Sequence, residues 1–77
     1  MLDELKKLGQ ELLPSNKIDW DKVNESTRLV EDLGFDSITF IMMSIRISED
    51  YDVNINQSDI EHLKTVGDVI EFISSHQ

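Results

Sequence analysis

The sequence predicts an all-α fold, a small four-helix bundle of three longer helices and one short helix with a long first loop. Apolar residues recur at three- and four-residue steps in three separate segments, which is the period of a helix that buries one face. Val53 and Ile55 alternate with polar residues as in a strand, but this stretch is only five residues long and has no second strand to pair with. The 77 residues are expected to form a single domain, 1–77, because this length allows one modest core.

The first helix is expected to run from residue 2 to about residue 13. Asp3 and Glu4 lie in its first turn, where carboxylates favour the positive end of the helix dipole. Pro14 follows its end and cannot continue a helix. Four leucines form its apolar stripe: Leu2, Leu5, Leu8 and Leu12.

Residues 15–36 lose the helical period and are rich in Ser, Asn and Thr, so we expect a long loop there. Loops of more than about 12 to 15 residues are uncommon in compact domains and are often functional, although a short helical turn inside this one would make it more ordinary. Six apolar residues are expected to hold the loop against the core: Ile18, Trp20, Val23, Leu29, Val30 and Leu33.

The second helix is expected from Ser37 to about Asp50, and it has two apolar faces. One face consists of Phe40, Met43, Ile47 and Tyr51, and the opposite face consists of Ile38, Ile41, Met42 and Ile45. Tyr51 extends the first face while Glu49 interrupts the second, so we assign the first face to the core. The second face then needs a partner, a ligand or another part of the chain to cover it.

Two further helices are expected in the last third of the chain. Ser58 and Glu61 have the spacing of a capping box, which predicts the start of the short helix. Thr65 and Asp68 form an acidic variant of the same motif and predict the start of the last helix, which is expected to end near Ser74. Its apolar residues recur at helical spacing: Val66, Val69, Ile70 and Ile73.

The composition excludes several classes of function. The formal net charge of −9 would repel a phosphate backbone, so nucleic acid is not expected as a partner. The chain has no cysteine, which excludes a disulfide framework and a thiolate metal site. No apolar run approaches the roughly 20 residues of a membrane span, and Asp3 and Glu4 near the N-terminus do not fit a signal peptide. We therefore expect a monomeric cytoplasmic protein.

The sequence offers little for catalysis or metal binding. A serine nucleophile needs a base, and only two histidines are present, His62 beside apolar residues and His76 next to the C-terminus. Asp19 and Asp21 begin like an EF-hand loop, but the later ligand positions are not filled by suitable residues. Neither catalytic residues nor a metal site are predicted, and the protein is not expected to be an enzyme.

Asp36 and Ser37, at the junction of the long loop and the second helix, have two interpretations. Either residue could simply cap the helix, since both types are common caps. Alternatively, Ser37 could be a modification site, because free backbone amides and the positive end of the dipole at a helix N-terminus stabilise a phosphate group. Local sequence alone favours the cap.

The segment Leu33-Gly34-Phe35-Asp36-Ser37-Ile38 resembles the attachment motif of the acyl carrier proteins, a family of phosphopantetheine-binding carrier proteins. The resemblance extends over nearly the whole chain, from the first helix through the long loop to residues 65–73, which are similar to the last helix of the family. Asp-Ser followed by an aliphatic residue is common by itself. Its combination with the preceding Asp32, the length, the acidity and the order of helices identifies the chain as a member of this family.

The resemblance implies that Ser37 carries 4′-phosphopantetheine donated by coenzyme A, with Asp36 recognised by the phosphopantetheinyl transferase. The arm would hold acyl groups as thioesters for partner enzymes: a loading ligase or transferase, a synthase and a thioesterase. Four residues would then face these partners: Ile38, Ile41, Met42 and Ile45. The core stripe on the other side of the helix could part to shelter an acyl chain.

One feature departs from the family pattern. Fatty-acid carriers usually present carboxylates along the second helix, but positions 38–48 contain none, and Arg46 adds a positive charge. The expected function is therefore a discrete acyl carrier in fatty-acid, polyketide or a related specialised lipid pathway, with specialised pathways favoured. An aminoacyl or peptidyl carrier is the alternative, although Phe35 stands where those domains usually have glycine. An unmodified acidic adaptor, with Ser37 only a helix cap, is the remaining possibility.

Overall fold

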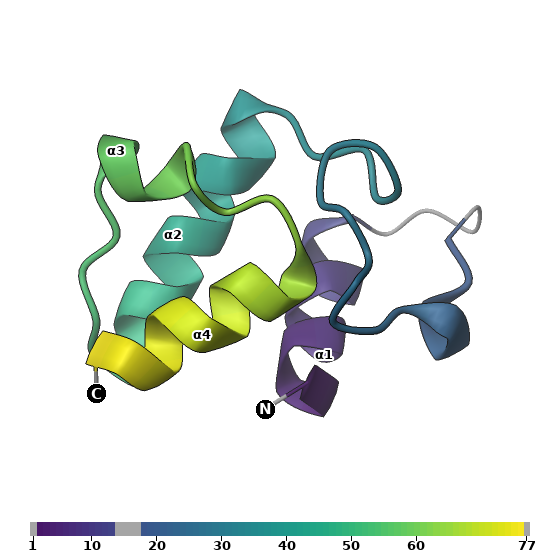
Figure 1. Ribbon diagram of the computed structural model, residues 1–77, viewed down its shortest axis with the longest axis horizontal. Coiled ribbons are helices and arrows are strands. Elements are labelled where there is room, and N and C mark those ends of the chain that lie inside the picture. Colours follow the sequence, from purple (N-terminus) through teal and green to yellow (C-terminus); the bar gives the residue numbers. More distant parts are fainter. Residues whose placement is uncertain (1, 14–17, 77) are drawn as a thin grey trace.

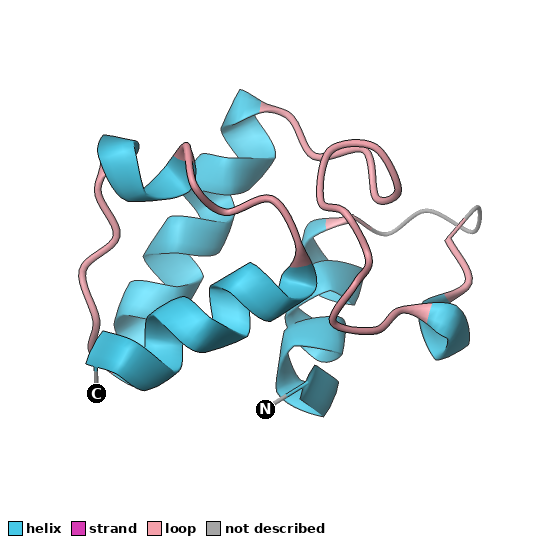
Figure 2. Cartoon of the chain, viewed as in Figure 1, coloured by secondary structure: helices cyan, strands magenta, loops and turns pink. Residues whose placement is uncertain are grey.

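A computed structural model describes residues 2–13 and 18–76 (Figure 1). In chain order it contains α1 (Leu2–Leu12), a 3₁₀ turn η1 (Trp20–Lys22), α2 (Ser37–Tyr51), α3 (Gln57–Ile60) and α4 (Val66–His76). Figure 2 shows helices joined by loops, and the described part of the chain contains no strand. The predicted all-α bundle of three longer helices and one short helix is thus confirmed. The predicted helix stop at Pro14 lies outside the described residues.

The core lies where α1, α2 and α4 meet the loop between α1 and α2. Ile47 of α2 and Ile73 of α4 are both 0% exposed. Burial of side chains of this size is the main stabilising contribution in a chain without disulfides. The buried apolar residues are Leu8, Val23, Leu29, Leu33, Phe35, Met43, Ile47, Val53, Leu63, Val66, Val69 and Ile73.

Backbone hydrogen bonds hold the long loop to the segment that leads into α4. The Leu29 N–H donates to the Lys64 carbonyl at 2.9 Å, and the Gly67 N–H donates to the Glu25 carbonyl at 2.8 Å. A Cβ atom at Gly67 would lie 3.0 Å from that carbonyl oxygen, a tighter contact than most Cβ atoms make, so the close approach favours glycine. Although it is long, this loop is therefore fixed to the bundle on its route to α2.

The prediction that Val30 packs against the core is wrong. Its side chain is 53% exposed, whereas Leu29 and Leu33 are buried. The chain turns back on itself at this point, with the Gly34 N–H donating to the Val30 carbonyl at 3.1 Å. Within such a turn the neighbouring side chains point in different directions, and only Leu29 and Leu33 point inward.

The predicted cap of α3 is also wrong. Asn56, not Ser58, precedes the helix: the Asn56 side-chain oxygen accepts the Asp59 N–H at 3.0 Å, and the Asp59 carboxylate accepts the Asn56 N–H at 3.1 Å. Ser58 instead donates its hydroxyl to the Asn56 side chain at 2.7 Å. Asn and Asp form the same reciprocal box as Ser and Glu, which moves the start of the helix.

The predicted start of α4 is confirmed. The Asp68 N–H donates to the Thr65 hydroxyl at 3.1 Å, and the Asp68 carboxylate accepts the Thr65 N–H at 3.1 Å. The helix ends at His76, two residues beyond the predicted Ser74. His76 lies stacked on Phe72, with ring centroids 4.1 Å apart.

Candidate functional site

Asp36 caps the N-terminus of α2. Its backbone is extended, with φ −121° and ψ −176°, and its Oδ1 atom accepts two hydrogen bonds from Thr39, one from the N–H and one from the hydroxyl, both 2.9 Å long. Thr39 is itself buried at 8% exposure. The cap is therefore anchored to a side chain that packs into the bundle, which fixes the point where the loop becomes helix.

The two donors on Thr39 also affect the charge of Asp36. The Thr39 N–H, followed by its hydroxyl, stabilises the carboxylate form and holds the pKa of Asp36 below its ordinary value. Asp36 is thus a carboxylate at neutral pH. Since one of its oxygens is used by the cap, the negative charge is held in a defined position beside Ser37.

Ser37 is the first residue of α2, and its side chain is exposed. Among the described residues, its hydroxyl has no hydrogen-bond partner. The N–H groups of Ser37 and Ile38 have no carbonyl partner within the helix, because they lie in its first turn. The site therefore combines an accessible hydroxyl with N–H groups that lack a carbonyl partner, at the positive end of a 15-residue helix, which suits a phosphodiester anion.

The residues before Ser37 fix its position. Gly34 has φ +76°, a left-handed conformation that favours glycine, and it turns the chain so that Phe35 enters the core. Phe35 donates its N–H to the Leu29 carbonyl at 3.0 Å. Its ring meets Phe40 edge to face, with centroids 5.2 Å apart. Two aromatic anchors, one on each side of Ser37 in the sequence, hold the start of α2 against the bundle.

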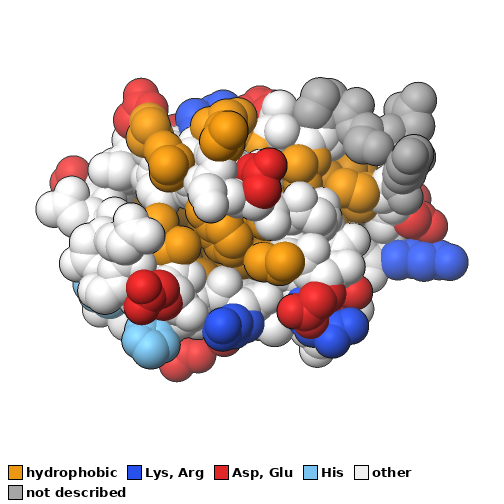
Figure 3. All heavy atoms as spheres, turned by 90° about the horizontal axis from the view of Figure 1, so that it is seen from above, with side chains coloured by type: hydrophobic (Ala, Val, Ile, Leu, Met, Phe, Trp, Pro, Cys, Tyr) orange, Lys and Arg blue, Asp and Glu red, His pale blue; other side chains and the backbone are white. Residues whose placement is uncertain are grey.

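The structure separates the two apolar faces of α2 as predicted. Met43 and Ile47 are buried, and Phe40 and Tyr51 are half-buried. The opposite face forms what we call the exposed stripe: Ile38 (68% exposed), Ile41 (56%), Met42 (39%) and Ile45 (54%). Figure 3 shows hydrophobic side chains reaching the surface on the face of the molecule seen from above. The stripe begins directly after Ser37.

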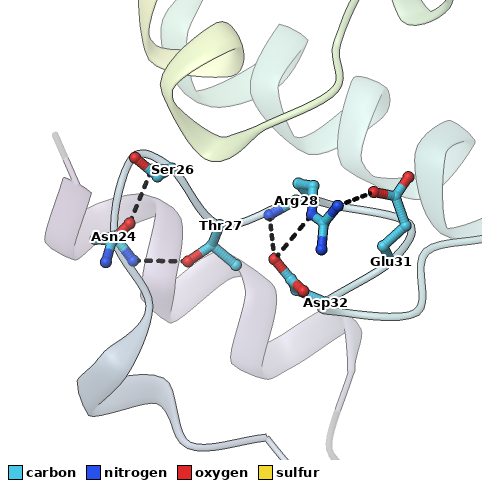
Figure 4. Close-up of polar contacts among 6 residues, drawn as sticks. All are labelled: Asn24, Ser26, Thr27, Arg28, Glu31 and Asp32. Atoms are coloured by element: carbon cyan, nitrogen blue, oxygen red, sulfur yellow. Dashed lines mark hydrogen bonds and ion pairs between the residues drawn. The ribbon is translucent and has the colours of Figure 1, made fainter.

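A network around Arg28 closes the turn that precedes the site (Figure 4). The Arg28 guanidinium lies 2.8 Å from the Glu31 carboxylate and 3.5 Å from the Asp32 carboxylate. The Arg28 N–H also donates to Asp32 at 2.8 Å, and this bond, with the guanidinium, lowers the pKa of Asp32. Two of the acids near the site are therefore paired within the loop itself.

Two polar contacts join α1 to α2 away from Ser37. Arg46 lies 2.7 Å from the Glu11 carboxylate, and this hydrogen bond raises the pKa of Arg46. Tyr51 donates its hydroxyl to Glu4 at 2.7 Å. Partial burial, followed by the bond to Glu4, raises the pKa of Tyr51 to about 12. The positive charge that distinguishes α2 in the sequence is thus paired with α1.

An apolar cavity of about 30 Å³ lies inside the bundle, beneath the loop. This volume accommodates only one or two water-sized groups. Phe35 and Met43 form the part of its wall that is nearest to Ser37 in the sequence. The full lining is Leu5, Lys6, Leu8, Gly9, Leu12, Trp20, Val23, Leu29, Leu33, Phe35, Met43, Val66 and Val69.

The described residues contain no group of three or more His, Asp or Glu side chains placed to hold a metal ion. Over the same residues, no helix is long and apolar enough to cross a membrane. His62 and His76 border a shallow open groove beside α3 and α4, on other elements than Ser37.

Two residues that support the site, Thr39 and Arg28, are not predicted from the sequence. Thr39 lies three positions after Asp36, the spacing at which a capping partner is expected. Its neighbours in the sequence are apolar, so the pattern of α2 does not indicate a polar contact at this position. Arg28 lies three and four positions before Glu31 and Asp32, a spacing that predicts ion pairs only where the chain is helical or tightly turned. The structure shows that the chain is tightly turned here, because the N–H groups of Asp32 and Leu33 both donate to the Arg28 carbonyl.

Residues 5–73 match the protein family described as "Phosphopantetheine attachment site". The chain is 33% identical over 76 residues to an acyl carrier protein of Clostridium perfringens, covering 99% of this chain and 96% of that protein. It is 38% identical over 60 residues to an acyl carrier protein of Chlamydia felis, covering 78% and 77% of the two chains. A solved structure described as an acyl carrier protein from Mycobacterium tuberculosis superposes with a TM-score of 0.78 over 97% of both chains, at 26% identity.

Proposed function

Since the chain belongs to the acyl carrier protein family, whose members carry 4′-phosphopantetheine covalently on a serine, we propose that Ser37 is the attachment point in this protein. The single observation that carries this proposal is the position of the Ser37 hydroxyl, exposed at the N-terminus of α2 directly after the Asp36 cap. Members of the family carry intermediates for biosynthetic enzymes and do not catalyse reactions themselves.

The residues around Ser37 fit the arm. In the attachment step the Ser37 oxygen bonds to the pantetheine-side phosphorus of coenzyme A, the pyrophosphate bond breaks, and adenosine 3′,5′-bisphosphate leaves. The hydroxyl proton passes to a base of the transferase. When bound, the arm supplies a terminal thiol that holds an acyl group as a thioester. The positive end of the α2 dipole and the N–H groups of its first turn that lack a carbonyl partner stabilise the new phosphodiester charge.

Asp36 and the exposed stripe are proposed to meet the partners. Asp36 keeps a fixed negative charge beside the hydroxyl, which suits recognition by a transferase that uses a divalent cation. The stripe of Ile38, Ile41, Met42 and Ile45 is the apolar surface of α2 that follows Ser37. The proposed partners are the transferase and enzymes that load, extend and release the acyl group.

The proposed pathway is a specialised lipid or polyketide synthesis rather than general fatty-acid synthesis. What supports it is the chemistry of α2, where positions 38–48 carry no carboxylate. The size of the internal cavity limits which acyl groups could be sheltered inside the bundle. At about 30 Å³ it has room for a few carbon atoms at most. A longer acyl chain would enter only if the helices move apart.

Intact-mass measurement tests the attachment point. The purified chain, incubated with coenzyme A and a transferase of broad specificity, should gain the mass of one phosphopantetheinyl group. Ser37→Ala should gain nothing, while Ser74→Ala, at another exposed serine, should gain the same mass as the unaltered chain. Full modification of Ser37→Ala would assign the arm to another residue.

A further inference from the structure

The backbone and the side chain of Asp36 are held by different bonds. The Asp36 carbonyl accepts the Phe40 N–H at 3.0 Å, which fixes the backbone at the start of α2. The side-chain oxygen Oδ1 accepts the N–H and the hydroxyl of Thr39, each at 2.9 Å. Any residue other than proline would supply that N–H, whereas the hydroxyl depends on the residue type. What threonine adds at position 39 is therefore a second bond to the Asp36 carboxylate.

The Thr39 hydroxyl is itself held in place. The Thr39 side chain is 8% exposed, and among the described residues it is the one buried polar side chain. A branched side chain in a helix has few rotamers at its first torsion. Burial and the bond to Asp36 restrict it further, and that bond satisfies the buried hydroxyl. Thr39 thus presents a fixed donor to Asp36.

The carboxylate that receives this bond would otherwise turn. Asp36 is exposed, and the terminal torsion of an aspartate side chain is broad. One bond from an N–H group leaves the carboxylate free to swing, whereas two donors on the same oxygen restrict it. Both donors reach Oδ1, so Thr39 does not use the second oxygen, Oδ2. Because Asp36 directly precedes Ser37, Thr39 influences how Oδ2 is presented beside the Ser37 hydroxyl.

From this geometry we propose that Thr39 is a positioning residue for the attachment step. Its hydroxyl orients the Asp36 carboxylate, so that the transferase meets this carboxylate and the Ser37 hydroxyl in one fixed arrangement. The inference rests on the proposed function, because it concerns the recognition of Asp36 beside the modified serine. It extends that function by giving a role to a buried residue that acts only through Asp36.

The physical reason is the entropy of binding. A partner that contacts a mobile side chain must immobilise it, and a side chain that is already fixed avoids that cost. The contact with Asp36 is made on the surface of the carrier, away from the bonds that change, so it contributes equally to the bound state and to the transition state. Loss of the orientation should therefore raise KM and leave kcat almost unchanged.

Two substitutions of Thr39 separate position from packing. Thr39→Val keeps the branched shape and the backbone N–H but removes the hydroxyl donor. Thr39→Ser keeps the hydroxyl but removes a buried methyl group. A role in packing makes the serine variant the more damaged of the two, while a role in positioning makes the valine variant the more damaged.

The measurement is the steady-state modification of the chain by a transferase of broad specificity. Thr39→Val should raise KM for the chain by about five-fold, with kcat unchanged, because the carboxylate loses one of two donors. Thr39→Ser should change KM by less than about two-fold, although its Tm should fall by a few degrees. An increase in KM as large for Thr39→Ser as for Thr39→Val would overturn the proposal.

Ser44→Ala is the matched control for removing a hydroxyl from α2. The Ser44 hydroxyl donates to the Phe40 carbonyl at 2.7 Å and not to Asp36. Its removal should leave KM unchanged. An increase equal to that of Thr39→Val would show a general effect of the helix and overturn the positioning role.

Two further measurements test whether Thr39 acts through Asp36. In a chain that already carries Asp36→Ala, adding Thr39→Val should not change KM further, and an additional increase would contradict the proposal. A carbon NMR titration follows the Asp36 carboxyl directly. Thr39→Val should raise the pKa of Asp36 toward its ordinary value, because the lost hydroxyl stabilises the carboxylate. An unchanged pKa would show that the hydroxyl does not hold the carboxylate.

These outcomes separate the inference from the proposed function. Modification of Ser37 in Thr39→Val with an unaltered KM would refute the positioning role and leave the carrier function intact. Failure of the transferase to modify the unaltered chain would refute the function, and the inference with it. Loss of folding in Thr39→Val would also overturn the positioning role, because the hydroxyl would then be required by the bundle itself.

Discussion

The two faces of α2 are both apolar, but one is buried and the other is exposed. Ile47 is 0% exposed, while Ile45, two positions earlier, is 54% exposed. Met43 is buried at 4%, and its neighbour Met42 is 39% exposed. Hydrophobicity alone therefore does not distinguish a core residue from a surface residue in this helix.

The two faces of α2 thus give one helix two different surfaces. The inner face packs against α1, shares one hydrophobic core with the buried residues of α4, and contributes to the stability of the bundle. The outer face contributes little to stability, because its side chains remain largely in water. An apolar surface of this kind carries a cost in solubility, so its position beside Ser37 points to a use in binding.

Replacing equivalent residues on the two faces should have the most unequal effects. Ile47→Ala should lower the free energy of unfolding by about 3 kcal/mol, because it removes buried methyl groups and leaves a cavity. Ile45→Ala should change it by less than about 0.5 kcal/mol. Urea denaturation followed by circular dichroism measures both.

Because the loss at Ile47 could unfold so small a domain, the gentler pair Ile47→Val and Ile45→Val serves as a control. A loss of about 1 kcal/mol is expected at Ile47 and almost none at Ile45. Equal losses at both positions would mean that the stripe packs against the protein itself and is not a free surface.

The Asp36 cap should have the next largest effect, since it supports both faces by fixing the start of the helix. Asp36→Ala is expected to lower Tm by about 5 °C. The folded pKa of Asp36 lies below the unfolded value of about 3.9, so the contribution of the charged cap is present above about pH 4 and is lost as pH falls through the folded pKa. Tm measured from neutral to acid pH should therefore fall less steeply in Asp36→Ala. An identical acid dependence would contradict this role of the cap.

Tyr51, at the end of the inner face, should contribute less. Tyr51→Phe removes the hydrogen bond to Glu4 and is expected to lower the free energy of unfolding by about 0.5–1 kcal/mol. The folded pKa of about 12 lies above the unfolded value of about 10, so this contribution is complete below pH 10 and declines between pH 10 and 12. The unaltered chain should lose stability over that alkaline range, and Tyr51→Phe should lose less. The titration of tyrosine absorbance gives the pKa directly.

Salt should have the smallest effect and should not distinguish the two faces. With a net charge of −9, raised NaCl is expected to screen repulsion and to increase Tm by a few degrees. The difference in stability between Ile47→Ala and Ile45→Ala should be the same at low and high salt, because it comes from apolar burial. A difference that varied with salt would indicate an electrostatic origin.

Much of the fold and of the site could be predicted from residue spacing. The period of Leu5, Leu8 and Leu12 predicts α1, and Thr65 with Asp68 predicts the start of α4. Both depend on contacts within a few residues of each other. The cap of α3 was placed incorrectly because Asn56 and Ser58 are equally suitable by type, and only the path of the preceding chain selects between them.

By itself, the sequence determined which residues lie on each face of α2 and that Asp36 and Ser37 stand at its start, because the helical period and the capping rules are local. Only the tertiary structure decided that Val30 is exposed, that Thr39 is buried as the partner of Asp36, and that Arg28 pairs with Glu31 and Asp32. These features depend on how the long loop folds back and bonds to the segment before α4. The spacings of Asp36 with Thr39 and of Arg28 with Asp32 are local, but the burial of Thr39 and the fold of the loop around Arg28 follow from the packing of the whole chain.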